Sequence, residues 1–294
     1  DLVAVGPRWT THHEDYVIAA AAVGAHGIIE KPLSTDLVEA DAMVHAIEAT
    51  NLKWAIGFNI RGTAQYQHAK RMILEEGLIG DVLELRGRGK EDHRAGGEDL
   101  IVLGTHVFDL MMDLAGEPTW CAADIQVNGR PARVDDIREA TEPIGPVVGD
   151  SLAATFGFAN GSYGHFASMK SSDGNGGRFG LDVYGTKGMV TMRWGVLPDV
   201  FVMHRSSWAP EEAGAPWKHL PGMPDTSVTP PVEERYAPIV ENMLNCIDTD
   251  ALPAVSLQDG RKVVELTPAV FAAHASGGRI ALPLQERRHP LRVW

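Results

Sequence analysis

Apolar runs and helical patterns alternate along the first sixty residues. Runs rich in apolar residues at 2–6, 26–31 and 53–59 predict short strands, and the stretches between them, 13–24 and 34–51, predict helices. Because parallel neighbours need a crossover connection, strands that alternate with helices of this length indicate βαβ units. These residues therefore predict part of a doubly wound parallel sheet.

The helix predicted at 34–51 carries both a start signal and an apolar face. Ser34 or Thr35 is expected to cap its amino end, where a hydroxyl oxygen accepts from a free backbone N–H. Apolar residues then recur at spacings of three and four: Leu37, Ala40, Met43, Val44 and Ile47.

The pattern changes after Arg61. A helix is predicted at 64–77, and strand patterns then dominate, with a tight hairpin at Asn160-Gly161 and another around 185–188. The last helix, 257–278, is expected to break or kink near Pro268. The predicted fold class is therefore α/β and α+β: a partial doubly wound, Rossmann-like sheet, then a domain with a large, mostly antiparallel, open-faced sheet.

Composition narrows the possible partners. With 26 Lys plus Arg against 39 Asp plus Glu, the formal charge is -13, and no basic run is present, so neither nucleic acid nor a membrane surface is an expected partner. No stretch approaches the roughly 20 apolar residues that span a bilayer, and no secretion pattern opens the sequence, so we expect a cytoplasmic protein. Cys121 and Cys246 lack CxxC spacing and predict buried free thiols.

The strand-rich part also suggests self-association. The whole chain's length of 294 residues favours two domains. Alternating apolar residues in the second one, Val183, Met189, Thr191 and Phe201, predict a sheet face that packs on another copy of the chain. We therefore expect a homodimer or homotetramer built through the antiparallel sheet.

Two polar segments follow predicted strands. Residues 7–13 and the pair Glu30-Lys31 lie at the carboxyl ends of strands, where open α/β sheets bind ligands. Pro32 disfavours helical backbone angles at Lys31, so the strand end fixes the direction of this side chain. The alternative interpretation is a solvated strand end, which is the commoner one for an isolated Glu-Lys-Pro.

His106 and Asp109 form a second candidate site. They are three residues apart and share one face if the second half of residues 96–116 is helical. His106 could make a structural hydrogen bond, which the spacing alone favours, or transfer a proton near neutral pH. A metal site is the third interpretation, because Glu91, Asp92, His93, Asp99, His106 and Asp109 lie close together in the sequence. No HExxH motif or close pair of histidines occurs among them, and no metal is predicted.

Together these segments resemble the Gfo/Idh/MocA oxidoreductases, which are nicotinamide-dependent sugar and polyol dehydrogenases. "AVGPRWTTHHEDYVIAAAAVGAHGIIEKPLS" is similar to the family's strand, proline loop, histidine, helix and Glu-Lys-Pro block, "LGTHVFDLM" to its Gly-x-His-x-x-Asp helix start, and "DVYGTKGMV" to its Gly-Thr-Lys-Gly hairpin. The resemblance covers nearly the whole chain. It implies that residues 1–60 are the carboxyl-terminal part of a Rossmann-like dinucleotide-binding domain and that 61–294 form a substrate-binding and oligomerisation domain.

The resemblance also implies a cofactor, NAD or NADP, and a carbohydrate or polyol substrate. Lys31 would hydrogen-bond the hydroxyl that is oxidised, and His106 would be the acid/base or orient the substrate. The cofactor would be lined by Pro7, Arg8, Trp9, His13, Glu30 and Lys31. Polar residues of loops and strand ends are the candidates for substrate contact: Asn59, Arg61, Glu91, Arg94, Asp99, Asp109, His165, Lys170 and Arg178.

Two departures from the family pattern leave a second hypothesis open. Val102 stands four residues before His106, where the family carries an aspartate, and Asp99 is the candidate substitute. The GxGxxG turn is absent, and "GNGGRFG" at 174–180 opens a strand rather than a helix. Either a segment of roughly 60–100 residues precedes the sequence, or the chain is a non-catalytic binding or assembly subunit. The inner edge of the parallel sheet is then expected to be covered by another element or partner.

Overall fold

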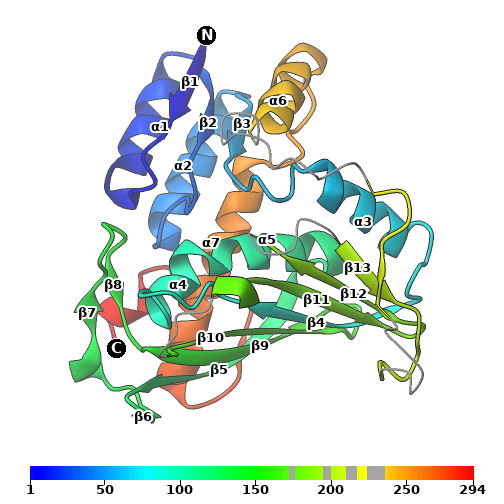
Figure 1. Ribbon diagram of the computed structural model, residues 1–294. Helices are drawn as coiled ribbons and strands as arrows, with labels where there is room; N and C mark the ends of the chain where they lie inside the picture. Colours follow the sequence, from blue (N-terminus) through cyan, green and yellow to red (C-terminus); the bar gives the residue numbers. More distant parts are fainter. Residues whose placement is uncertain (172–175, 195–199, 210–216, 224–235) are drawn as a thin grey trace.

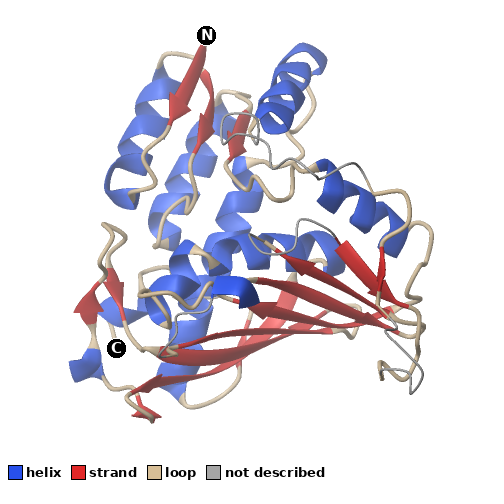
Figure 2. Cartoon of the chain, in the orientation of Figure 1, coloured by secondary structure: helices blue, strands red, loops and turns tan. Residues whose placement is uncertain are grey.

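The computed structural model describes residues 1–171, 176–194, 200–209, 217–223 and 236–294. A small sheet and a large sheet lie in separate layers, with helices between and around them (Figures 1 and 2). Part of "GNGGRFG", Asp199 and much of the Pro- and Gly-rich sequence at 207–231 lie outside the described residues.

The small sheet confirms the parallel pattern. It consists of β1 (Leu2–Val5), β2 (His26–Ile29) and β3 (Trp54–Ile56), in the order β1-β2-β3 and all parallel. Helices α1 (His13–Ala22) and α2 (Leu37–Ala49) make the crossovers between them. Because the three strands run the same way, the residues after β1, β2 and β3 all emerge at one edge of this sheet.

The start of α2 was predicted one or two residues too early. Its N-cap is Asp36, whose carboxylate accepts from the backbone N–H of Val38 at 2.8 Å. The Ser34 hydroxyl instead donates to the backbone oxygen of Asp36 at 2.7 Å. An aspartate carboxylate caps a helix as well as a serine or threonine hydroxyl does. Residue type therefore cannot decide which of the adjacent residues Ser34, Thr35 and Asp36 is the N-cap.

The large sheet is mixed but mostly antiparallel. Its order is β14-β13-β12-β11-β4-β10-β9-β5-β15, with β6 beside β5, and the one parallel pair among its described strands is β4 with β10. The hairpins predicted at Asn160-Gly161 and around 185–188 are present, joining β9 to β10 and β11 to β12. The strands are β4 (Val82–Arg88), β5 (Pro118–Val127), β6 (Arg130–Pro131), β9 (Ser151–Phe158), β10 (Tyr163–Met169), β11 (Gly180–Gly185), β12 (Met189–Arg193), β13 (Val200–Met203), β14 (Lys218–His219) and β15 (Ile280–Ala281).

Helix α5 (Gly104–Ala115) covers one face of the large sheet (Figure 1). The ring of Phe108 packs against Phe156 and Phe166 from neighbouring strands, with ring centroids 5.3 and 5.0 Å apart. Gly87 of β4 lies so close to α5 that a Cβ there would stand 2.2 Å from a methyl group of Val107. The missing side chain at Gly87 therefore sets how closely α5 approaches the sheet.

Replacing Gly87 with alanine should lower the free energy of unfolding by about 1–3 kcal/mol, because the new methyl group overpacks the contact between β4 and α5. Urea unfolding measures this loss. Gly278→Ala is the matched control, since a Cβ at Gly278 meets nothing within 4 Å. Equal stability of Gly87→Ala and the wild type would mean that α5 moves away from the sheet without cost.

The opposite face of the large sheet corrects one prediction. Val183 pairs with Val190, is fully buried and faces the helices, whereas Met189, Thr191 and Phe201 share the other face. Apolar residues alternate within each of these strands, but only the pairing between strands decides which residues of different strands lie on the same face of the sheet. Val183 is therefore a core residue and does not belong to the open face.

The end of the chain returns to the small sheet. Helix α6 (Ala237–Thr249) packs on β3, and α7 (Leu257–Ser276) packs on both β3 and β5. Of the break or kink predicted near Pro268, a break is absent, because α7 continues through this residue as one helix. Pro268 is flanked by buried residues such as Leu266 and Val270, and this packing outweighs the hydrogen bond that proline removes.

The remaining helices are α3 (Ala64–Leu74), which ends three residues before the predicted limit, and the short α4 (Gly97–Val102) before α5. A separate ribbon of β7 (Arg138–Glu139) and β8 (Pro146–Val147) flanks α4. Cys121 and Cys246 are buried free thiols, as predicted. Within the described ranges, none of the helices has the length and apolarity needed to cross a bilayer.

Candidate active site

Lys31 lies directly beyond the carboxyl end of β2. Only 8% of it is exposed, and its Nζ donates to the backbone oxygen of Val102, at the end of α4, at 2.7 Å. Burial lowers the pKa of Lys31 to about 8, against the opposing effect of the Glu30 carboxylate. The end of β2 thus places an amine against the helix layer of the large sheet, and this amine changes charge near neutral pH.

His106 lies in the first turn of α5 and is 7% exposed. The ring of Phe58 stands edge-on to it, with centroids 6.0 Å apart. Burial and the positive charge of Lys31 lower the pKa of His106 well below its ordinary value, so the imidazole is neutral at pH 7. A neutral imidazole near a buried ammonium can accept a proton from a group bound between them.

Glu30 is fixed by two donors. It accepts from the backbone N–H of Lys31 at 3.0 Å and from the hydroxyl of Tyr236, the residue before α6. Tyr236 was not among the predicted site residues. Nothing in its local sequence indicates that it reaches the end of β2.

His13 joins the loops that follow β1 and β2. Its Nε2 lies 2.8 Å from the backbone oxygen of Pro7, and its Nδ1 lies 2.9 Å from the backbone oxygen of Leu33. The side chain is fully buried. His13 therefore holds the Pro7–Trp9 loop and the residues after Lys31 at a fixed separation, and it acts from beneath the surface that these loops form.

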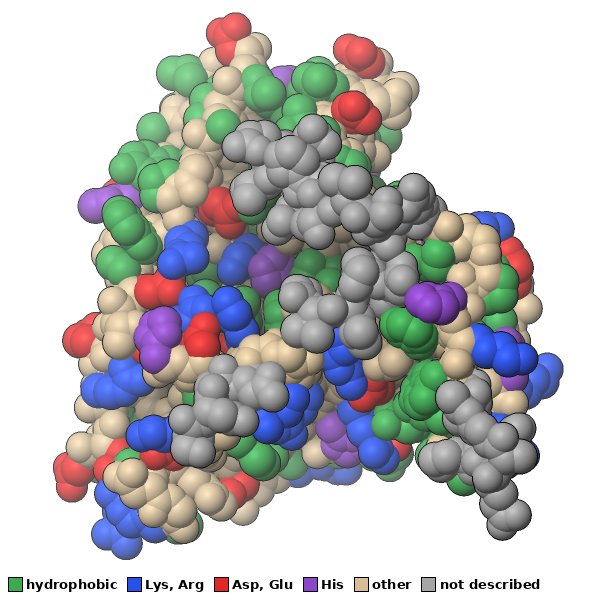
Figure 3. All heavy atoms as spheres, viewed as in Figure 1, with side chains coloured by type: hydrophobic (Ala, Val, Ile, Leu, Met, Phe, Trp, Pro, Cys, Tyr) green, Lys and Arg blue, Asp and Glu red, His purple; other side chains and the backbone are tan. Residues whose placement is uncertain are grey.

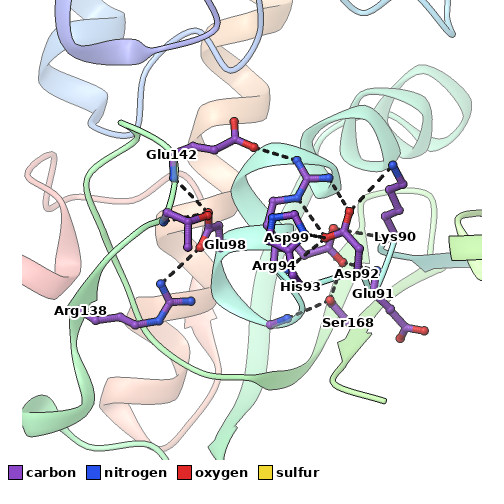
Figure 4. A network of polar contacts seen from close by, with 12 residues as sticks. Lys90, Glu91, Asp92, His93, Arg94, Glu98, Asp99, Arg138, Glu142 and Ser168 are labelled. Atoms are coloured by element: carbon purple, nitrogen blue, oxygen red, sulfur yellow. Dashed lines mark hydrogen bonds and ion pairs between the residues drawn. The ribbon is translucent and has the colours of Figure 1, made fainter. Parts of the chain in front are cut away.

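Arg8 and Arg94 share one carboxylate, that of Glu142. Arg8 Nε lies 2.8 Å from Glu142 Oε2, and Arg94 Nη1 donates to Oε1 at 2.8 Å. Arg94 also binds Asp92 through two nitrogens (Figure 4), which lowers the pKa of Asp92 to about 2. The charges of Arg8, Arg94 and Glu142 all act on Lys31. Lys, Arg and His side chains accordingly gather between the two layers on the face in Figure 3.

Glu98 of α4 supports this arrangement from below. It is fully buried and accepts from the backbone N–H groups of Thr141 and Glu142, from the Thr141 hydroxyl, and from Arg138 (Figure 4). The loop that carries Glu142 is therefore held by a carboxylate one helix away. Neither Glu98 nor Glu142 was predicted, because the partners of each acid lie 40 or more positions away in the sequence.

The structure does not bring Asp99 to His106. Both oxygens of its buried carboxylate are occupied, Oδ1 by the backbone N–H of Lys90 and Oδ2 by that of Glu91 and the hydroxyl of Ser168. Asp99 thus shapes the turn after β4. The position four residues before His106, Val102, contributes its backbone oxygen to Lys31 instead of a side chain.

Arg61 and Asp109 face each other in an ion-pair cluster. Arg61 lies 3.0 Å from Asp109, 3.1 Å from Asp113 and 3.3 Å from Asp259. These groups line a crevice of about 210 Å³ beside α5. Both residues were predicted to contact substrate, and in the structure their charges are directed at each other.

Three of the other five predicted substrate residues bind groups elsewhere, and two are described by their position alone. Glu91 is fully buried between Arg88 and Arg178, and it contacts them at 2.6 and 2.5 Å. His165 lies on the face of the large sheet opposite α5, beside Glu84 and Thr155. Lys170 is exposed after β10, and Asn59 is half-buried in the turn after β3. The structure thus groups Lys31, His106 and Arg94, and separates His165 from them.

No group of three or more His, Cys, Asp or Glu side chains suited to a metal ion occurs among the residues that the structure describes. The titratable groups gathered at the site are therefore an amine, an imidazole and paired charges.

Two family descriptions match this chain. That of the oxidoreductase-family C-terminal α/β domain covers residues 73–282, and that of the oxidoreductase-family NAD-binding Rossmann fold covers residues 1–58. The chain belongs to the Gfo/Idh/MocA oxidoreductase family. The fold class inferred from the sequence agrees with this membership.

Named relatives within the family act on sugars and cyclitols. Levoglucosan dehydrogenase of Pseudarthrobacter phenanthrenivorans is 30% identical over 206 residues, which are 62% of this chain and 53% of that protein. Myo-inositol 2-dehydrogenase of Thermotoga maritima is 30% identical over 115 residues, 37% of this chain and 34% of that one. The matched region therefore spans about half or less of these relatives.

Solved structures share the fold across nearly the whole chain. Levoglucosan dehydrogenase in complex with NADH and levoglucosan matches with a TM-score of 0.78 at 23% identity, covering 96% of this chain and 80% of that one. Aldose-aldose oxidoreductase from Caulobacter crescentus, complexed with glycerol, matches with a TM-score of 0.71 at 20% identity, covering 96% and 79%.

Proposed function

We propose that this protein is an NAD(P)-dependent oxidoreductase that transfers a hydride between a nicotinamide cofactor and a hydroxyl of a sugar, cyclitol or glycoside. The observation that carries the proposal is the convergence of the Lys31 amine and the His106 imidazole, both buried and both with lowered pKa, from two different layers of the fold. Family membership and the sugar and cyclitol dehydrogenases among its relatives support the same reaction class.

The residues present fit the nicotinamide end of such a cofactor. Pro7, Arg8 and Trp9 follow β1, and Glu30 and Lys31 follow β2, so they lie at the edge where a parallel sheet binds dinucleotides. Exposed Trp9 offers a flat apolar surface beside Arg8. When bound, the nicotinamide supplies a hydride acceptor. NAD and NADP are both compatible with these residues.

The roles of Lys31 and His106 follow from charge balance. As a C–H hydride leaves the alcohol carbon, the O–H proton must also leave to give a carbonyl. The Lys31 ammonium would hydrogen-bond the oxygen and stabilise its developing negative charge. Neutral His106 would accept the proton. Arg94, paired with Asp92 and Glu142, would bound the substrate side of the site.

Titration of the purified protein with NADH and NADPH, followed by nicotinamide fluorescence, tests the cofactor half of the proposal. Absorbance assays with levoglucosan, myo-inositol and aldoses in the presence of NAD⁺ or NADP⁺ then test the substrate half. We expect saturable binding of at least one dinucleotide and its reduction by at least one of these polyols. Absence of dinucleotide binding would favour a non-catalytic binding or assembly subunit.

Replacing Glu142 with glutamine should weaken NADH binding by up to about fivefold, because the ion pair that holds half-exposed Arg8 is lost. Arg94 keeps its two bonds to Asp92, so the effect should be confined to the Pro7–Trp9 loop. Fluorescence titration gives the dissociation constants. Glu139→Gln, an exposed neighbour in β7, is the control and should leave binding unchanged; equal affinities for all three proteins would remove Glu142 from cofactor binding.

We also propose that the open face of the large sheet joins copies of the chain into a dimer or tetramer, with residues 61–294 supplying this face. Tyr163 of β10 is half-exposed there, and its ring packs against Trp120. Light scattering should give the mass of an oligomer, and Tyr163→Glu should shift it toward the monomer. Leu252→Glu, exposed between α6 and α7, serves as control. A monomeric wild type would refute the assembly.

A further inference from the structure

His106 and Asp109 lie on the same side of α5 and are covered by the same segment. The ring of Phe58 contacts His106, and Arg61, three residues further along the chain, donates to Asp109 Oδ1 at 3.0 Å. The segment 58–61 therefore runs along the helix from one side chain to the other. Residues three apart on a helix have Cβ atoms about 5–6 Å from each other.

Each of these two side chains has one buried atom without a hydrogen bond. Among the described residues, His106 Nδ1 and Asp109 Oδ2 are both sealed from solvent and unpaired, and Asp109 is only 2% exposed. Leaving a buried polar atom unpaired costs about 1–3 kcal/mol, so a partner is expected for each. A water molecule between polar atoms on adjacent turns satisfies both atoms at once.

The two atoms are also chemically matched. A neutral imidazole carries one proton, and a water that donates a hydrogen bond to a carboxylate becomes a better acceptor, so it favours the proton on Nδ1. With the proton on Nδ1, the lone pair is on Nε2, the nitrogen that is not sealed inside the protein. This is the tautomer that can take a proton from a bound alcohol.

We propose that Asp109 is a positioning residue for His106, acting through one buried water between Oδ2 and Nδ1 that fixes the tautomer with Nε2 as proton acceptor. The role of Nε2 as proton acceptor rests on the proposed function, whereas the tautomer itself does not. Asp109 would thus orient His106 in place of an acidic side chain at position 102, where Val102 offers no side-chain acceptor.

The surroundings of the pair set the pH at which it works. Three charged groups face Asp109: Arg61, Asp113 of α5 and Asp259 of α7. Asp113 in turn binds Lys70 and Tyr66 of α3. Lys31 faces His106. Burial raises the pKa of Asp109 to about 7, with Arg61 opposing and Asp113 adding to the shift. The carboxylate form, which accepts from the bridging water, is therefore dominant at roughly pH 8 and above.

Nitrogen-15 NMR of the histidine rings at roughly pH 8 tests the tautomer directly. We expect His106, assigned by its loss in His106→Gln, to carry its proton on Nδ1. In Asp109→Asn, the amide oxygen still accepts from Arg61, but an NH₂ donor stands in the place of the acceptor Oδ2. The proton of the His106 ring should therefore move to Nε2. Asp113→Asn also removes a negative charge beside Arg61 but should leave the tautomer unchanged, because both Asp113 oxygens already have partners.

Two results would overturn the proposal: a wild-type His106 protonated on Nε2, which needs no variant to be folded, or an unchanged His106 spectrum in Asp109→Asn. In the activity assay, Asp109→Asn should lower kcat at least about tenfold with little change in KM, as expected for a misoriented base. Inactivity of every form, wild type included, would refute the proposed function, while the spectra would still decide the tautomer.

Discussion

Replacing Lys31 with methionine should lower kcat for polyol oxidation by about 10²–10³-fold, because the cation that stabilises the developing alkoxide is lost. Methionine fills nearly the same volume, so the fold should be retained. Steady-state assays and urea unfolding measure the two effects. The control is Lys53→Met: Lys53 is equally buried but precedes β3, at the opposite end of the strands, and pairs with Asp250. Its kcat should match the wild type.

The pH dependence separates the two possible roles of Lys31. Burial lowers the pKa of this amine to about 8, so the ammonium is present below that pH and is lost above it. If the cation is the active form, the oxidation rate should fall as the pH rises through about 8. Lys31→Arg remains charged and should be slower but free of that fall. A wild-type rate that instead rises through about 8 would make Lys31 the base.

The sequence predicted the features that depend on neighbouring residues. Alternation of apolar runs and helices gave the parallel sheet, and Asn160-Gly161 gave its hairpin, because turn geometry is decided by the residues of the turn itself. Lys31 and His106 were predicted through motifs of a few residues. Each motif includes the backbone feature that orients it, a strand end before Lys31 and a helix start before His106.

Pairings between distant segments could not be predicted in this way. His165 and Phe166 are adjacent in β10, yet only Phe166 faces α5, and the register of β10 with its neighbours decides which one does. Val183 was assigned to the wrong face for the same reason. Glu142, Glu98 and Tyr236 reach the site from segments whose local sequence has no distinctive pattern. Their roles depend on folded positions, which residue type does not encode.

Replacing Glu98 with alanine should lower the free energy of unfolding at pH 7 by roughly 3 kcal/mol, because a fully buried carboxylate with several donors is lost and a cavity remains. Burial raises the pKa of Glu98, but the donors from Thr141 and Arg138 outweigh it and lower the pKa overall. A lowered folded-state pKa stabilises the fold above the unfolded value of about 4.3 and loses that contribution as the pH falls. Urea unfolding should therefore show a difference between wild type and Glu98→Ala that is steady near pH 7 and shrinks below about pH 4. Glu139→Gln should show neither effect, and a pH-independent loss in Glu98→Ala would mean that packing, not charge, holds the loop that carries Glu142.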